Sequence, residues 1–385
     1  MTYLDNAATT LYKPKSVQKA VCAALKESGG AGRGGHAAAL RAAEIIYGAR
    51  ETAAELFRMR DPERVIFTSN GTHSLNIAIK SLAARGGRVV VSGFEHNAVI
   101  RPLYRLSQEI GVKVDVIPTP LFEPEMAVSL FEMALDGDVC LAVCTHVSNV
   151  FGYVLPIERI WALCKHRGVP LIVDAAQSAG VLPIAGDSGP YFCMPGHKGL
   201  YGPQGTGLLL CPPDGLILKN LIEGGTGSAS SDSAMPNFYP DRLEAGTPNA
   251  PSIAGLNAGM RYIINSGIPH TATEFDLSDP PHRKMLYRLH CSLAAIWGVK
   301  SYYTDGLYCQ SGVISFNIEG QEPESVAARL AAKGIAVRAG LHCAPTAHKT
   351  AGTFPGGTVR ASIGAFNTTA DIRRLAAAVR GIVKG

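Results

Sequence analysis

The sequence predicts an α/β fold in which a mostly parallel sheet forms a large domain and a smaller α+β domain follows toward the C-terminus. Short apolar segments typical of buried strands recur between residues 64 and 211, and helical patterns separate several of them. Alternation of this kind produces parallel strands covered by helices. After Pro251 the order of helices and strands changes, which indicates the second domain.

The individual elements follow from the hydrophobic periodicity. Strands of the large sheet are predicted at residues 64–68, 88–92, 112–118, 139–145, 170–174, 191–194 and 206–211. Helices are predicted between them at residues 74–84, 98–110 and 157–167. In the C-terminal part we predict helices at 253–264, 283–296, 323–332 and 369–382, strands at 312–318, 335–338 and 358–362, and a polar loop that runs through residue 281. The Gly-, Ser- and Thr-rich stretch 224–233 is either a mobile loop or an inert linker.

The composition favours a protein of two domains in a reducing compartment. With 385 residues, of which 46% are hydrophobic and 17% charged, the chain can bury a large core. The formal charge of +5 is modest and no basic cluster with interleaved aromatic residues occurs, so nucleic acid is not an expected partner. Nine cysteines without CxxC spacing argue against a disulfide framework. Because no apolar run is long enough to span a membrane, we expect a cytoplasmic protein.

A lysine among glycines is the most informative local feature. Lys198 lies in the segment PGHKGLYGPQG, directly after the strand predicted at 191–194. Glycine permits close backbone approach, and partial burial or a cationic neighbour such as His197 lowers a lysine pKa, as Schiff-base formation with a carbonyl cofactor requires. If this segment is considered alone, the alternative to a Schiff-base lysine is a solvated lysine on a surface turn.

Asp174 adds a second observation upstream of the lysine. It ends the apolar segment LIVD and is followed by small residues. A carboxylate at the C-terminal end of such a strand lies where ligands bind in open α/β sheets, and it can keep a pyridine nitrogen protonated. A helix cap is the alternative role. The order of strand, aspartate, small residues and Gly-flanked lysine is similar to that of pyridoxal phosphate (PLP) enzymes of the aspartate aminotransferase fold type.

Nearly the whole chain resembles the cysteine desulfurases of the class V aminotransferase family. The motifs that carry the resemblance are, in order, YLDNAATT, GRGGH, EHNAV, HVSNVFG, VDAAQSAG, PGHKG, EAGTPN, RAGLHCAP and VRAS. The resemblance implies a PLP-dependent transferase of fold type I. It implies a large PLP-binding domain at residues 13–250 and a small domain at residues 1–12 and 251–385 that carries the catalytic cysteine loop. The implied reaction converts L-cysteine to L-alanine and leaves a persulfide on Cys343 for sulfur transfer.

Other functions stay open at this point. A selenocysteine lyase would act on L-selenocysteine with the same residues. A class V aminotransferase or a simple PLP lyase would need Lys198 and Arg360 but not Cys343. A non-enzymatic scaffold is disfavoured, because Asp174 and His96 accompany these three residues.

The resemblance also implies how the phosphate of PLP is held. Gly71 and Thr72 open a helix after a strand, where backbone N–H groups favour an anion, although Thr72 could be a helix cap with no ligand. His197 is expected to contact the phosphate, and Thr247 to reach the phosphate of the neighbouring subunit, which implies a homodimer. Many relatives have Ser or Thr two residues before this histidine. Here Pro195 can donate neither a hydroxyl nor an N–H, so one phosphate hydrogen bond is expected to be missing.

Four residues are expected around the pyridine ring. By resemblance, His96 stacks on the ring and shuttles protons, whereas alone it would be an ordinary loop histidine. Asp174 is expected at the ring nitrogen, Gln177 at the phenolic oxygen, and Lys198 at the aldehyde carbon, with the same lysine acting as the base.

The motif RAGLHCAP narrows the expected activity. Cys343 lies in a Gly- and Pro-flanked loop between Arg338 and Arg360, with His342 adjacent, so we predict a reactive nucleophile rather than a buried thiol. A metal site at His342 and Cys343 lacks further ligands, so no metal is expected. Arg360 can hold the substrate carboxylate with two parallel hydrogen bonds, or else form a surface salt bridge. The other residues predicted to bind substrate are Asn149, which could instead be a turn residue, Arg338, and His36 near the active-site entrance.

The short interval between Cys343 and Arg360 resembles that of desulfurases with a compact catalytic loop. The persulfide of that group usually needs a docked acceptor or reductant. A sulfur-acceptor protein is therefore an expected partner, in addition to L-cysteine or L-selenocysteine. The sequence does not separate sulfur from selenium as the preferred element.

Overall fold

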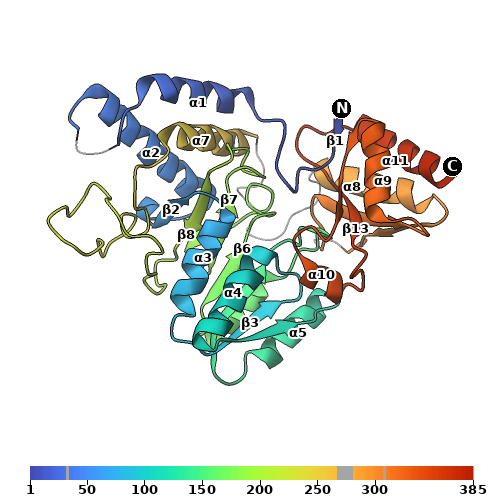
Figure 1. The fold of residues 1–385 in the computed structure, drawn as a ribbon, viewed down its shortest axis with the longest axis horizontal. Coiled ribbons are helices and arrows are strands. Elements are labelled where there is room, and N and C mark those ends of the chain that lie inside the picture. Colours follow the sequence, from blue (N-terminus) through green and yellow to red (C-terminus); the bar gives the residue numbers. More distant parts are fainter. Residues whose placement is uncertain (32–33, 267–280, 307–308, 385) are drawn as a thin grey trace.

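A seven-stranded sheet forms the centre of the structure, a computed structural model that describes residues 1–31, 34–266, 281–306 and 309–384 (Figure 1). Its strands are β2 (Val65–Thr68), β3 (Arg88–Ser92), β4 (Lys113–Ile117), β5 (Val139–Thr145), β6 (Leu171–Asp174), β7 (Tyr191–Pro195) and β8 (Gly207–Leu210). They are ordered β2-β8-β7-β6-β5-β3-β4, and only β8 runs antiparallel to its neighbours. All seven predicted strands are confirmed to within one residue at each end, as is the mostly parallel sheet.

Helices cover both faces of this sheet. Alternate residues of each strand enter different apolar cores, as the pleat of a strand requires. One core packs against α3 (Gly71–Leu82) and α4 (Asn97–Ile110), and the other against α2 (Ala37–Leu56), α5 (Pro124–Ala134) and α6 (Ile157–His166). The helices predicted at 74–84, 98–110 and 157–167 are confirmed, whereas α2, α5 and α1 (Lys15–Glu27) lie where no helix was predicted.

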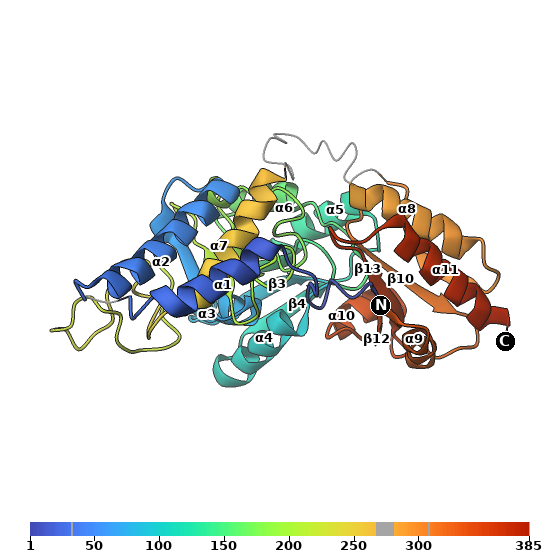
Figure 2. The same ribbon diagram turned by 90° about the horizontal axis from the view of Figure 1, so that it is seen from above.

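Helix α7 (Ala250–Asn265) extends the large core beyond the boundary predicted at residue 250. It packs against α1 and α2 (Figure 2), and its buried residues from Ala250 to Ile263 join the core of the seven-stranded sheet. Close approach explains the packing, because a Cβ at residue 259 would lie 2.2 Å from the Leu200 carbonyl oxygen. The hydrophobic pattern predicted this helix but could not show which sheet it covers.

A second, antiparallel sheet lies in the C-terminal part (Figures 1 and 2). Its strands, in the order β12-β13-β10-β9, are Arg338–Gly340, Thr358–Ser362, Val313–Ile318 and Val299–Tyr302. Helices α8 (Pro281–Ala294), α9 (Pro323–Ala332) and α11 (Thr369–Lys384) pack with it around one core, and α10 (Pro345–Thr350) follows the cysteine loop. Strand β9 was not predicted, and the strand predicted at 335–338 divides into β11 (Ile335–Ala336) and the start of β12.

The first residues of the chain also belong to this C-terminal core. Strand β1 (Thr2–Tyr3) pairs in parallel with β11, and Leu4 is fully buried among side chains of α8, α9 and α11. Most of the polar loop predicted before residue 281 lies outside the described residues. Within the described part of the chain, no helix combines the length and the apolar character needed to cross a bilayer.

Candidate active site

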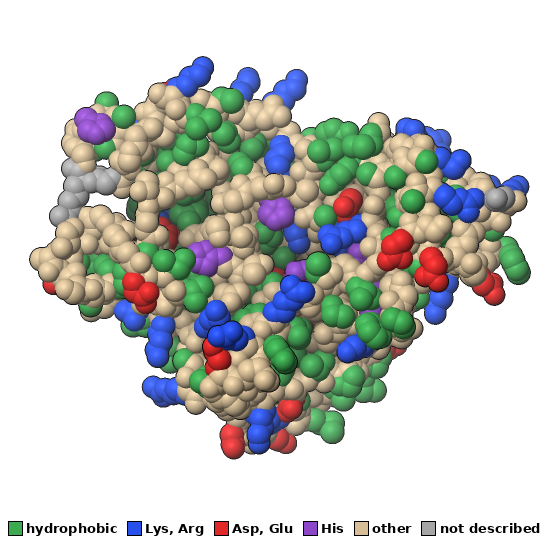
Figure 3. All heavy atoms as spheres, viewed as in Figure 1, with side chains coloured by type: hydrophobic (Ala, Val, Ile, Leu, Met, Phe, Trp, Pro, Cys, Tyr) green, Lys and Arg blue, Asp and Glu red, His purple; other side chains and the backbone are tan. Residues whose placement is uncertain are grey.

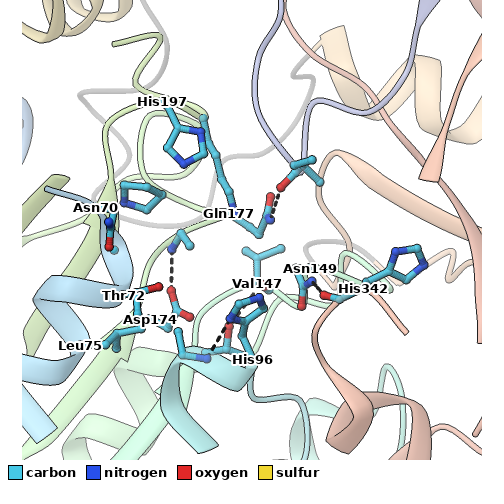
Figure 4. Close-up of a pocket in the computed structure, with 18 of the residues that line it drawn as sticks. Asn70, Thr72, Leu75, His96, Val147, Asn149, Asp174, Gln177, His197 and His342 are labelled. Carbon is cyan, nitrogen blue, oxygen red and sulfur yellow. Dashed lines mark hydrogen bonds between the residues drawn. The ribbon is translucent and has the colours of Figure 1, made fainter. Parts of the chain in front are cut away.

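The carboxyl edge of the large sheet gathers most of the predicted site residues. Asp174 ends β6, Lys198 follows β7, Thr72 begins α3 after β2, His96 follows β3 and Asn149 follows β5. These residues line one cavity of roughly 230 Å³ (Figure 4), to which β12 and β13 add two arginines and the loop after β12 adds a histidine. The lining also includes Gly71, Gln177, His197, Arg338, His342 and Arg360.

Burial makes the side-chain amine of Lys198 easier to deprotonate. Removal from water lowers its pKa to about 8, the neighbouring Asp174 carboxylate opposes this shift, and the guanidinium groups of Arg360 and Arg338 reinforce it. Burial also raises the pKa of Asp174, whereas the Ala176 N–H and the positive charge of Lys198 lower it. The cavity thus holds an amine that is easily neutralised opposite a carboxylate at a strand end.

The beginning of α3 forms one end of the cavity. Asn70 caps the helix by accepting the His73 N–H at 2.9 Å, and the first N–H groups of a helix, at Gly71 and Thr72, have no helical acceptor. Pro195 lies against this turn, because a Cβ on Gly71 would be 3.0 Å from the Pro195 Cδ. His197 also lines the cavity (Figure 4), and its Nδ1 lies 3.0 Å from the Thr9 Oγ1.

The hydrogen bond of His96 determines which of its ring nitrogens can act. The Nδ1 atom accepts the Ala98 N–H at 3.0 Å, so Nε2 is the atom that remains for a ligand. Burial and the positive charges of Lys198 and three arginines lower the pKa of His96 to about 4. The imidazole is therefore neutral at neutral pH and carries its hydrogen on Nε2.

Glu95 is a buried carboxyl group that the sequence analysis did not assign. It has no exposed surface, and its Oε1 accepts the Thr145 N–H at 2.6 Å and the Ser92 hydroxyl at 2.5 Å. Burial raises the pKa of Glu95 to about 8, and the charge of Asp174 adds to the increase. Because Thr145 pairs with Asp174 in the sheet, Glu95 fixes the strand next to the one that carries Asp174. An acidic residue three positions after an apolar strand was the signal available in the sequence.

Two further residues missed in the sequence connect the N-terminal segment to the site. The Asp5 Oδ1 accepts a hydrogen bond from the Arg360 Nη2 at 2.8 Å, and the Arg360 side chain is only 1% exposed. Lys13 Nζ donates to the Thr10 Oγ1 at 2.7 Å and to the His197 carbonyl at 3.2 Å, and burial lowers its pKa to about 8. Both lie near the start of the chain, and each contacts a partner remote in sequence, Arg360 for Asp5 and His197 for Lys13.

The predicted amide residues already make contacts to the backbone. Gln177 Nε2 donates to the Ala7 carbonyl at 2.9 Å, and Asn149 Nδ2 donates to the His342 carbonyl at 2.8 Å (Figure 4). The backbone carbonyl of Asn149 accepts a hydrogen bond from the Arg360 Nη1 at 2.8 Å. Each amide and each Nη atom carries two hydrogens, so one remains on each of them for a ligand.

The cysteine loop has an unusual backbone. His342 and Cys343 are consecutive non-glycine residues in the left-handed region, with φ of 50° and 57°. The His342 carbonyl accepts from Asn149, and the Cys343 carbonyl accepts the Asn97 N–H at the start of α4 at 2.8 Å. Cys343 is exposed, and its Sγ lies 3.8 Å from the Arg338 Nη2. The loop therefore exposes the thiol, while hydrogen bonds from Asn97 and Asn149 hold its backbone.

Three of the predicted site residues do not line this cavity, namely Cys343, which lines a neighbouring cavity, Thr247 and His36. Thr247 is exposed in the loop before α7, and the exposed His36 caps α2 by accepting the Ala39 N–H. Neither lines the cavity, so their roles stay predictions. Among the described residues, no group of three or more His, Cys, Asp or Glu side chains is placed to hold a metal ion.

Comparison with known proteins identifies the family. The family described as aminotransferase class-V matches residues 2–375 of the chain. The chain belongs to this family. Class V aminotransferases of the cysteine desulfurase group are generally PLP-dependent, and the resemblance and the fold class expected from the sequence are thus confirmed.

Several relatives of this class V aminotransferase are described as cysteine desulfurases. A probable cysteine desulfurase of Methanothermobacter thermautotrophicus is 34% identical over 97% of this chain and 92% of that protein. One of Mycolicibacterium paratuberculosis is 31% identical over the whole chain, which spans 56% of that longer protein. The apo structure of a cysteine desulfurase from Thermococcus onnurineus NA1 superposes with a TM-score of 0.88 at 31% identity, covering 100% of this chain and 94% of that one.

Proposed function

We propose that this chain is a PLP-dependent cysteine desulfurase that converts L-cysteine to L-alanine and takes the sulfur as a persulfide on Cys343. The observation that carries the proposal is the anchored loop that presents Cys343 beside the cavity of Lys198 and Asp174. The descriptions of the relatives support it.

The residues that line the cavity fit PLP. The free N–H groups of Gly71 and Thr72, together with His197, suit a phosphate, and glycine at 71 leaves room beside Pro195. Asp174 suits the pyridine nitrogen, and Lys198 suits the aldehyde carbon. When bound, PLP would supply an electron sink that weakens the bonds at Cα of the amino acid and then the Cβ–Sγ bond.

Lys198 and Arg360 are proposed to act on the amino acid itself. With a pKa of about 8, a substantial fraction of Lys198 is neutral near neutral pH, and the neutral amine can take the proton from Cα. The remaining Nη hydrogens of Arg360 and the second amide hydrogen of Asn149 can hold the carboxylate. The Nε2–H of His96 faces the same cavity as a hydrogen-bond donor.

Cys343 is proposed to accept the sulfur. Its thiolate attacks Sγ of the substrate, an S–S bond forms, and the Cβ–Sγ bond breaks. The bonding pair stays on Cβ, which gains a proton and becomes the methyl group of alanine. The Arg338 guanidinium places positive charge beside the attacking sulfur.

Two finer predictions belong to the same proposal. Thr247 reaches the phosphate site of a second copy, so the active form is a homodimer, which fits its exposure here and its distance from the cavity lining. An acceptor protein then removes the sulfur from Cys343, in a cytoplasmic setting where thiols stay reduced.

The test is to give the protein cysteine, selenocysteine and a 2-oxo acid amino acceptor in turn, and to quantify alanine, sulfide and selenide. Brief exposure to cysteine should add one sulfur atom to the Cys343 peptide in mass spectrometry. Cys343→Ala should lose cysteine desulfuration by orders of magnitude, while Cys291→Ala, an exposed cysteine on α8, serves as the matched control. Sulfide release by Cys343→Ala at the wild-type rate would indicate a plain lyase, and turnover of selenocysteine alone would indicate a selenocysteine lyase.

A further inference from the structure

A second cavity of about 340 Å³ lies beside the candidate active site, between α3 and α4. Thr72, Asn76 and Lys80 line it from α3 with helical spacing, and Arg101 and Arg105 line it from α4. Cys343 lies at one end, where Thr72 and His96 belong to both cavities. This α3–α4 groove therefore continues from the reaction site past the nucleophile to the surface.

The charge of the α3–α4 groove is positive. Lys80, Arg101 and Arg105 line it, and no carboxylate does. Arg105 pairs with Glu109 at 2.5 Å, but within the described part of the chain Lys80 and Arg101 form no salt bridge. Lys and Arg side chains gather over α3 and α4 on the face shown in Figure 3. Glu109 is the carboxylate near these cations, so an excess of positive charge remains at the mouth of the reaction site, which attracts anions and raises their association rate.

The dimensions of the groove suit a short extended segment. From Thr72 to Lys80 the α3 face covers eight residues, or about 12 Å at 1.5 Å per residue. An extended chain covers that length with about four residues. A cysteine in such a segment would meet Cys343 when carboxylates two to four residues away lie beside Arg101 and Lys80.

We propose that the α3–α4 groove binds an acidic, cysteine-containing segment of the sulfur-acceptor protein, which rests on the persulfide chemistry proposed above. The acceptor thiolate attacks the outer sulfur of the Cys343 persulfide, one S–S bond forms and the other breaks, and Cys343 leaves as a thiolate. The sulfur moves without any oxidant or reductant. Lys80 and Arg101 select the acceptor by charge and do not take part in the chemistry.

The test uses three synthetic nine-residue peptides with one central cysteine, flanked by Asp and Glu, by Ser and Gly, or by Lys. The protein is loaded with cysteine and desalted, and the rate constant of sulfur transfer to each peptide is measured by mass spectrometry. At low ionic strength the acidic peptide should react at least about tenfold faster than the basic one, and salt should reduce the difference.

Charge-reversal variants locate the effect. The double variant Lys80→Glu, Arg101→Glu should reverse the order of the acidic and basic peptides while still loading with sulfur. Arg373→Glu, Arg380→Glu on the exposed face of α11 makes the same change in net charge and should keep the wild-type order. Equal rates for all peptides, or equal effects of the two double variants, would overturn the proposal.

A binding measurement separates this proposal from the enzymatic one. The same peptides with Ser in place of Cys are titrated by fluorescence anisotropy, so the result does not depend on persulfide formation. A protein that never loads sulfur but binds the acidic peptide through Lys80 and Arg101 refutes the desulfurase proposal alone. A protein that loads sulfur but binds the three peptides equally refutes the groove alone.

Discussion

The cavity at the sheet edge and the Cys343 loop prepare their reactive groups in different ways. In the cavity, burial moves the pKa of Lys198 down to about 8, of His96 down to about 4 and of Glu95 up to about 8. In the loop, Cys343 is exposed, and what distinguishes it is a left-handed backbone held by hydrogen bonds from Asn97 and Asn149.

The difference indicates how each region should respond to mutation. Where burial shifts the pKa of a reactive group, its reactivity depends on the charge and volume of the neighbouring side chains. Where the backbone conformation positions a thiol, its reactivity depends on the hydrogen bonds that hold the carbonyl groups of the loop. Substitutions that alter charge should therefore act strongly in the cavity, and loss of a single positioning bond should act on the loop.

Lys198→Ala should produce the largest effect. Because both the covalent attachment of PLP and the removal of the Cα proton are proposed to depend on this amine, alanine formation from cysteine should fall at least about 10⁴-fold. Absorbance and borohydride trapping followed by peptide mapping measure the attachment. Cys343→Ala is the matched variant, which should keep the colour and the trapped peptide. A borohydride-stable bond to the cofactor in Lys198→Ala would contradict the role given to this lysine.

Glu95→Gln should change the pH dependence of stability. The ordinary pKa of 4.5 applies to the unfolded chain and about 8 to the folded one. Between these values the folded carboxyl retains a proton that the unfolded one has lost, so its contribution to stability falls as pH rises. Relative to Glu95→Gln, the wild type should lose on the order of 4 kcal/mol of unfolding free energy from pH 4.5 to 8. Urea unfolding of both proteins across this range provides the measurement, and parallel curves would show that Glu95 ionises normally.

Asn149→Ala should produce the smallest of the three effects and separates the two regions most directly. Removing the Nδ2 bond to the His342 carbonyl should slow persulfide formation at saturating cysteine about tenfold, while PLP binding stays unchanged. Stopped-flow kinetics of the first turnover give the rate. The KM for cysteine should also rise, because the second amide hydrogen of Asn149 is proposed to hold the substrate carboxylate, and an unchanged rate at saturating cysteine would contradict its role in holding the loop.

The sequence predicted the large sheet well because most of its strands are buried on both faces, the edge strand β4 being the exposed exception. Continuous apolar segments such as 139–145 and 170–174 have few alternatives, and the carboxyl edge then brings Asp174, His96 and Lys198 together. The same reasoning failed for β9, whose residues 299–302 are only partly buried. It also failed for α2, where an alanine-rich segment gives a weak apolar stripe, and it missed the amphipathic α1.

The missed site residues share one physical cause. Asp5, Lys13 and Glu95 act through contacts to partners on other segments, and no local pattern in the sequence records such a contact. The left-handed conformations of His342 and Cys343 are likewise imposed by tertiary hydrogen bonds, because neither residue type favours them.

The Asp5–Arg360 ion pair has a consequence for synthesis of the protein. Its members are 355 residues apart, so at 5–20 residues per second Arg360 is made about 20–70 s after Asp5. The strands that place Asp174 and Lys198 are complete long before then, whereas Cys343 and the arginines beside it come from the last-made sheet. A nascent chain therefore contains Lys198 and the strands around it before it contains Cys343. Sulfur transfer to Cys343 becomes possible only after the first and last segments of the chain have packed together.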